Sequence, residues 1–207
     1  MKTILLLLTT TIILAFHAKA SLYQTGTIPD GNFVGTSFSG TYDQAAAGAT
    51  VSSLSVNLVL SGGFNGDLYA YLVAPNGSLV VLLNRPGVTS GNPFGYAGSG
   101  LNVSLSDTAS GSIQTTAESS GSVFTGTYQA AGTLANFNGS AANGTWTLYF
   151  ADESAGGGQA TLNGWSLDIT AVPEPVNVAL AIFGVGVVSI GAVRSFRPRA
   201  NPAPLAA

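Results

Sequence analysis

The chain has no cysteine and a single histidine, His17, among its 207 residues. Without cysteine it can form neither a disulfide framework nor a thiolate metal site, and it has no thiol nucleophile. Between Ser21 and Ala171 the chain also lacks histidine and lysine. This stretch therefore cannot build a Ser-His-Asp triad, a Cys-His pair, a Ser-Lys dyad or a histidine-ligated zinc site, and we expect it not to be an enzyme.

Positive charge is also scarce between Ser21 and Ala171, where Arg85 is the only base. The same stretch holds eight acidic residues: Asp30, Asp43, Asp67, Asp107, Glu118, Asp152, Glu153 and Asp168. A protein that grips nucleic acid needs clustered Lys and Arg side chains against the phosphates. We therefore expect no nucleic-acid partner.

The amino-terminal segment is typical of a secretory signal peptide. Lys2 gives a positive start, Ile4 to Phe16 form an apolar run, and Ala18-Lys19-Ala20 place small residues at the two positions that signal peptidase reads. We predict a signal peptide over residues 1–20, cut by signal peptidase between Ala20 and Ser21. The alternative, an uncleaved membrane anchor, requires an apolar run longer than this one.

Alternation of apolar and polar residues dominates residues 21–171 and predicts half-buried strands. The clearest examples are "SLSVNLVLSG", "LNVSLSD", "GTWTLYFAD" and "GWSLDIT", with two more strands in "DLYAYLVA" and "SLVVLLN". No helical period is sustained, and residues 108–132 predict loops around one or two weak strands. The fold class is therefore all-β, as a sandwich. The side chains expected to face its core are Leu54, Val56, Leu58, Leu60, Leu101, Val103, Leu105, Trp146, Leu148, Phe150, Trp165, Leu167 and Ile169.

The composition of the carboxyl-terminal segment changes twice along its length. Residues 176–193 are apolar except for Asn177 and Ser189, which predicts a transmembrane helix. Arg194, Arg197 and Arg199 follow as a basic stop that keeps this end in the cytoplasm. Together with a cleaved signal peptide, this places the β domain outside the inner membrane.

The sequence "VPEP" at Val172 to Pro175, an apolar helix and an Arg-rich end together resemble the PEP-CTERM sorting signal of Gram-negative bacteria. The resemblance covers residues 172–199, with Pro173, Glu174 and Pro175 as the motif and residues 200–207 as a tail. It implies an inner-membrane-anchored precursor that the transpeptidase exosortase cuts near the motif. The mature form would then be at the cell surface or extracellular, in a bacterium that makes exopolysaccharide or biofilm matrix. A plain membrane anchor is the alternative.

The domain itself resembles the P domain (P/Homo B domain) of subtilisin-like proprotein convertases, from Ile28 to Ile169. The resemblance rests on "GDLYAYLVAPNGSLVVLLNRPG", "LSDTASGSI", "TLANFNGSAANGTWTLYFAD" and "GQATLNGWSLDI", in this order. It implies a jelly-roll-like β-sandwich. It also implies a module that stabilises a neighbouring protease and does not cleave peptides itself, so a serine endopeptidase activity would belong only to the usual partner.

Three functions are compatible with these features. The first is a non-enzymatic surface or matrix protein, whose free-standing domain binds exopolysaccharide or another surface protein. The second is an accessory P domain that acts in trans with an exported subtilisin-like protease. The third is a carbohydrate-active enzyme, which needs two carboxylates facing each other across a cleft.

Two sets of side chains are candidates for a site. Asp67, Asp107 and Asp152 each lie at a strand boundary and are candidate ligands for a structural Ca²⁺; the alternative is that each caps a turn. Aromatic residues are candidates for a sugar-stacking surface, although they would equally serve as cover on the sandwich: Tyr69, Tyr71, Phe94, Tyr96 and Tyr149. We expect Arg85 to pair with one of the acids.

Overall fold

The computed structural model describes residues 16–19, 23–174, 179–180 and 183. By contacts the chain divides into two compact units, Met1–Val172 and Pro173–Ala207. The predicted cleavage point between Ala20 and Ser21, residue Pro175, the arginines of the basic stop and most of the predicted transmembrane helix lie outside the described residues. Within the described part, no helix is long and apolar enough to span a membrane.

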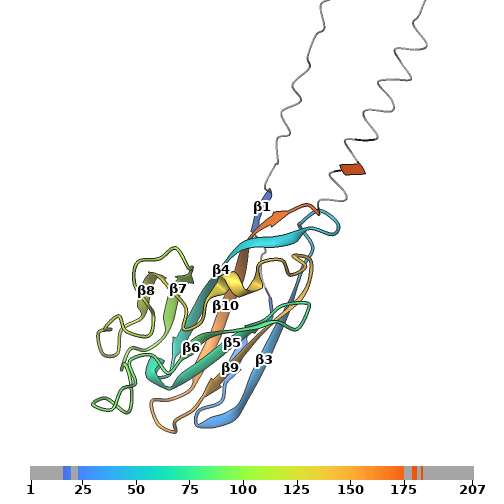
Figure 1. The fold of residues 1–207 in the computed structure, drawn as a ribbon. Coiled ribbons are helices and arrows are strands. Elements are labelled where there is room, and N and C mark those ends of the chain that lie inside the picture. Colours follow the sequence, from blue (N-terminus) through green and yellow to red (C-terminus); the bar gives the residue numbers. More distant parts are fainter. Residues whose placement is uncertain (1–15, 20–22, 175–178, 181–182, 184–207) are drawn as a thin grey trace, which may run out of the picture. The chain divides into compact units, whose positions relative to one another are not determined.

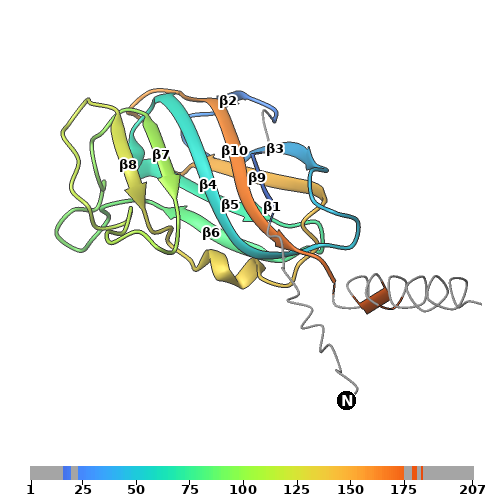
Figure 2. The ribbon, with the colours of Figure 1, turned by 90° about the horizontal axis from the view of Figure 1, so that it is seen from above.

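The first unit is a sandwich of two sheets, as Figures 1 and 2 show. In spatial order, sheet A contains β1 (Phe16–Lys19), β10 (Ala160–Val172), β4 (Thr50–Gly62), β7 (Leu101–Leu105) and β8 (Phe124–Tyr128), and β2 (Gly26–Ile28) also pairs with β10. Sheet B contains β3 (Asn32–Tyr42), β9 (Gly144–Asp152), β5 (Leu68–Val73) and β6 (Leu79–Asn84). Two short 3₁₀ helices, η1 (Asn65–Asp67) and η2 (Leu134–Phe137), complete the described elements. The predicted all-β sandwich is confirmed.

The core lies between the sheets, where the inward side chains of every predicted strand meet. All of the side chains expected to face the core are buried. In sheet B the strand register aligns Phe38, Leu148, Leu72 and Val80 in one inward row across four strands. Trp146 is fully buried against the ring of Phe137 at 5.3 Å, and its indole N–H donates to the Ala142 carbonyl at 3.1 Å.

Strands β1, β2 and β3 were not predicted, whereas β8 is one of the weak strands expected in residues 108–132. Residues 108–132 contain one strand, β8, which pairs in parallel with β7. The 11-residue strand β3 has few large apolar residues and a register shift between Asn32 and Thr36. Strand β1 lies inside the predicted signal peptide and pairs with β10 from Asp168 to Ala171. Removal of residues 1–20 would therefore remove this terminal strand of sheet A.

We expect Leu148→Ala to lower the free energy of unfolding by about 2–5 kcal/mol, because Leu148 is fully buried in the inward row. Val59→Ala is the control: Val59 is 40% exposed on sheet A, so its truncation should cost much less. Urea denaturation of the full chain and both variants measures the difference. Equal effects of the two substitutions would contradict the predicted core.

Candidate functional site

Two of the three predicted metal-ligand candidates lie at the same end of sheet B. Asp67 ends η1 immediately before β5, and Asp152 ends β9. Leu68, the neighbour of Asp67, is the direct cross-strand partner of Asp152, so the pairing of β5 with β9 brings both carboxyl groups to one place. Both residues are buried, with only 5% of Asp67 and 1% of Asp152 exposed.

Arg85 supplies the positive charge at this end, as the sequence predicts. Its guanidinium lies 3.6 Å from Oδ1 of Asp67. The backbone of Arg85 has a φ of 51°, and it is the only non-glycine residue with positive φ among the described residues. A hydrogen bond of 2.9 Å from its backbone N–H to the Leu68 carbonyl holds it in that left-handed conformation. The strained backbone therefore positions the guanidinium against the buried acid.

Burial changes the protonation of both carboxyl groups. Desolvation, and then the nearby Asp152 carboxylate, raise the pKa of Asp67 from 3.8 to about 6, while Arg85 acts in the opposite direction. Desolvation also raises the pKa of Asp152, opposed by a hydrogen bond of 3.3 Å from the backbone N–H of Ser154. The Arg85 cation thus compensates the burial of these two acids only in part.

Asp107, the third candidate, does not join them. Its two carboxylate oxygens accept hydrogen bonds from the backbone N–H groups of Leu134 and Ala135, at 2.9 and 2.7 Å. It therefore caps the start of η2, which satisfies N–H groups that have no partner within a helix. The expected Ca²⁺ ligand set of Asp67, Asp107 and Asp152 does not assemble, and no group of three or more potential ligands suited to a metal occurs within the described ranges. Asp107 is therefore a cap, but of a helix start 27 residues away in the chain and not of its own turn.

The two buried acids also do not form the carboxylate pair of a glycosidase. A cavity of about 310 Å³ opens beside Asp67, lined by Phe64, Phe94 and residues 154–157. Asp152 does not line this cavity and is almost completely buried. Two carboxylates facing each other across a cleft are therefore not found at this end of the described domain.

Three of the five aromatic candidates gather on the outer face of sheet B. Tyr71 stacks on Tyr149 with ring centroids 4.5 Å apart and planes at 15°, and Tyr69 lies 6.1 Å from Tyr71 in an edge-on arrangement. As predicted, the tyrosines of β5 lie opposite the fully buried Leu68, Ala70 and Leu72. Phe94 and Tyr96 belong to the loop between β6 and β7 and not to this face. We call Tyr69, Tyr71 and Tyr149 the tyrosine row.

The tyrosine row is tied to an irregular part of β3 that the sequence did not reveal. The Tyr149 hydroxyl donates to the carbonyl oxygens of Phe33 and Val34, at 3.0 and 3.1 Å. Both residues lie in the bulge of β3 and are largely exposed, and Gly35 turns the chain there with a φ of 60°. The row is therefore fixed at its β3 side by a hydrogen bond and by ring stacking.

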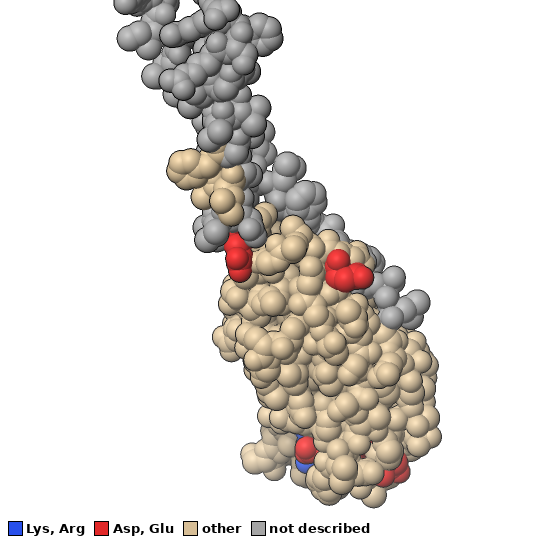
Figure 3. Space-filling view, turned by 90° about the vertical axis from the view of Figure 1, so that its right-hand side faces the viewer, with Lys and Arg blue, Asp and Glu red and all other residues tan. Residues whose placement is uncertain are grey.

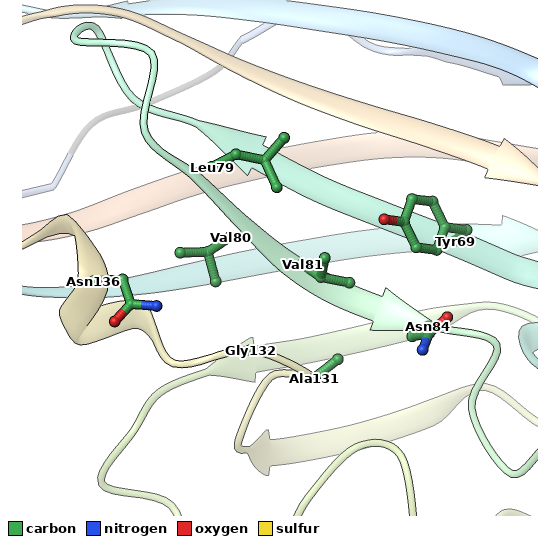
Figure 4. Close-up of a pocket in the computed structure, with 8 residues that line it drawn as sticks. All are labelled: Tyr69, Leu79, Val80, Val81, Asn84, Ala131, Gly132 and Asn136. Atoms are coloured by element: carbon green, nitrogen blue, oxygen red, sulfur yellow. The ribbon is translucent and has the colours of Figure 1, made fainter.

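A second cavity, of about 490 Å³, adjoins the row at the edge strand β6 (Figure 4). The segment that follows β8 forms its far side, because Ala131 and Gly132 donate to the Leu82 and Val81 carbonyls at 2.9 and 2.8 Å. The lining residues are Tyr69, Leu79, Val80, Val81, Asn84, Ala131, Gly132 and Asn136. This cavity could not be predicted from the sequence, because its walls come from β5, β6 and the segment leading into η2.

A buried polar cluster that was not predicted holds the loops at the end of sheet A. Asn65 is fully buried and donates to Oε2 of Glu118 at 2.8 Å and to the Gly100 carbonyl at 3.0 Å. Its side-chain oxygen accepts from the Gly100 N–H at 3.1 Å. These contacts fasten η1 to the start of β7, so we assign Asn65 a structural role.

Comparison with known proteins gave a family match and two structural likenesses. Residues 51–169 match the model of the proprotein convertase P-domain. The chain is 19% identical to the serine protease of Aeromonas sobria in complex with the chaperone ORF2, over 79% of this chain and 27% of that one, with a TM-score of 0.47. The same protease crystallised by itself gives 19% identity, 77% and 27% coverage, and a TM-score of 0.45. The chain thus spans about a quarter of the length of these proteases. A search of curated proteins gave no match.

We expect Asp67→Asn to gain stability relative to the unchanged chain as the pH rises. The raised pKa means that folded Asp67 keeps its proton between pH 3.8 and about 6, where the unfolded chain has lost it. The free energy of unfolding therefore falls as pH rises through this window, and the asparagine variant escapes that fall. From pH 4 to pH 7 the difference between variant and unchanged chain should shift by about 1–3 kcal/mol in favour of the variant.

Urea denaturation at both pH values measures this difference. Asp43→Asn, which removes one negative charge from an exposed position, is the control. The same difference between Asp67→Asn and the unchanged chain at both pH values would contradict the raised pKa.

Proposed function

The chain belongs to the proprotein convertase P-domain family, and from this premise we propose that it is an exported, non-catalytic binding module of the cell surface or extracellular matrix. The family match confirms the P-domain resemblance over residues 51–169. Residues 21–171 lack the histidine, cysteine and lysine of a nucleophilic site, and the paired acids Asp67 and Asp152 are buried. Because these features do not support catalysis, we propose that the domain acts by binding.

One observation carries the proposal of sorting to the surface. Strand β10 ends at Val172, the compact unit ends at the same residue, and the Pro-Glu-Pro motif begins at Pro173. A cut at this motif would therefore leave strands β2 to β10 intact. With a signal peptide over residues 1–20 and arginines after the apolar segment, this order supports export, transient anchoring in the inner membrane and release by exosortase.

The test is the intact mass and location of the protein in its own host, with and without the exosortase gene. We expect a product that begins at Ser21, ends near Pro175 and lies at the cell surface or in the medium. Without exosortase, a form that retains Arg194 to Ala207 should remain in the inner membrane. Glu174→Ala should also retain this tail, whereas the control Asn163→Ala, at an exposed position near the start of β10, should not.

A product that keeps its tail and stays in the inner membrane in the unchanged host would overturn the sorting proposal. A mature form that begins at Met1 would overturn the signal peptide. The two ends of the chain are therefore tested separately by one mass measurement.

Family membership also favours a second function, an accessory P domain that acts in trans with an exported subtilisin-like protease. Under this proposal the protease should copurify with the chain, and deletion of the chain's gene should lower the melting temperature of the protease. Copurification at substoichiometric amounts, with no change in protease stability, would count against it.

A further inference from the structure

We propose that the outer face of sheet B, together with the cavity at β6, binds a neutral polysaccharide. This inference rests on the proposed surface location and names the ligand class of that module. Its binding elements are the tyrosine row and two asparagine side chains at the cavity, Asn84 and Asn136.

The strand register arranges the rings across the face. Tyr149 of β9 is the direct partner of Tyr71 in β5, and Tyr71 is the partner of Val81 in β6. Neighbouring strands lie about 4.8 Å apart, which is close to the length of one pyranose unit. A sugar chain laid across the strands can therefore reach the outward edges of the Tyr149–Tyr71 pair, whose facing ring surfaces cover each other, and then the cavity wall.

The cavity offers hydrogen-bonding groups that the protein does not use. Within the described residues, the side-chain amides of Asn84 and Asn136 and the hydroxyl of Tyr69 make no hydrogen bond to the rest of the chain. In Figure 4, Tyr69 and Asn84 lie at neighbouring positions on β5 and β6, and Asn136 reaches the cavity from η2. An amide both donates and accepts, and this suits the paired hydroxyl groups of a sugar.

The outer face carries no charge along its paired strands. The residues that share the side of Tyr149 in β3 and β9 include Ser37, Ser39, Thr145 and Thr147, and the hydroxyls of Ser39 and Thr147 lie 3.2 Å apart. Figure 3 shows one side of the domain, on which the charged side chains lie near the two ends and the broad middle is uncharged. A face without cations has nothing to pair with an acidic polysaccharide, so the ligand that fits is a neutral one.

The composition of the face separates a sugar from a protein partner. The centre of a protein interface is apolar and fully desolvated. Along β5 and β9 rings and aliphatic side chains are interspersed with hydroxyls, and the rings stay half-buried against each other. Such a surface provides apolar contact with ring edges and many weak hydrogen bonds, which a long polysaccharide can use repeatedly.

The experiment is native gel electrophoresis of the full chain with a soluble polysaccharide cast into the gel. A polyoxyethylene detergent keeps the full chain in solution and carries no sugar head group that could compete. The probes are dextran, galactomannan and xyloglucan, with polygalacturonate as the acidic probe. We expect at least one neutral probe to retard the chain and polygalacturonate to leave its mobility unchanged.

Variants then locate the binding. Tyr71→Ala should weaken the apparent affinity about threefold to tenfold, as expected for the loss of one stacked ring. Asn136→Ala, at an exposed position, tests the cavity without a risk to folding. Tyr128→Ala is the matched control, because Tyr128 is also half-buried and stacks on Phe124 at 4.6 Å, but in sheet A. Melting temperatures of all three variants separate loss of binding from loss of fold.

The inference is overturned if no neutral probe retards the chain, if Tyr128→Ala weakens binding as much as Tyr71→Ala, or if neither Tyr71→Ala nor Asn136→Ala has an effect. A purified surface protein that binds through Tyr71 while every polysaccharide fails would assign the face to protein. A chain at the cell surface without sugar binding would end this inference and leave the surface location standing. A chain that binds sugar but stays in the inner membrane would overturn the surface location and leave the polysaccharide inference standing.

Discussion

The register of β5 against β9 is the constraint on which the other features of this domain depend. It places Leu72 opposite Leu148 on the core side and Tyr71 opposite Tyr149 on the outer side. Because side chains alternate along a strand, a slip by one residue would put the tyrosines into the core and the leucines into solvent. The same register brings Asp67 and Asp152 to one end of the sheet. Core, tyrosine row and buried acids are therefore three results of a single alignment.

The end of this strand pair at Asp67 and Asp152 differs in chemistry from the outer face beside it. At the end of Asp67 and Asp152, polar groups are buried and one arginine is held in a left-handed backbone conformation to face them. Along the rest of the outer face the groups are neutral and open to solvent. The two buried aspartates with a raised pKa, Asp67 and Asp152, thus lie together at this end of the domain.

Much of this fold can be predicted from the alternation of apolar residues, because burial on one face of a strand imposes a period of two. Leu54 to Leu60 and Trp146 to Phe150 show it clearly, and both are buried as expected. Strand β3 could not be predicted in this way, because its bulge interrupts the period of two and because glycines and serines occupy many of its positions. The site was harder. The prediction that Arg85 pairs with an acid was correct. The Asp107 cap of η2 could not be predicted, because its hydrogen bonds join residues that are 27 and 28 positions apart in the chain. The walls of the cavity come from segments that are distant in the sequence, and no local sequence pattern predicts that such segments pack together.

The position of β10 at the end of the domain determines when the sandwich can fold. It is the last strand of the domain, and it lies between β4 and the short strands β1 and β2, paired with β4 over nearly its full length. Until residues 160–172 are available, β4 has no partner on that side and its inward leucines have no neighbouring strand to pack beside. Pairing between strands so far apart in the chain is slow, because the intervening loop must first be closed. The sandwich is therefore completed only after its whole sequence has been made, and a chain that crosses a membrane amino-terminus first would remain open to binding by chaperones for the entire passage.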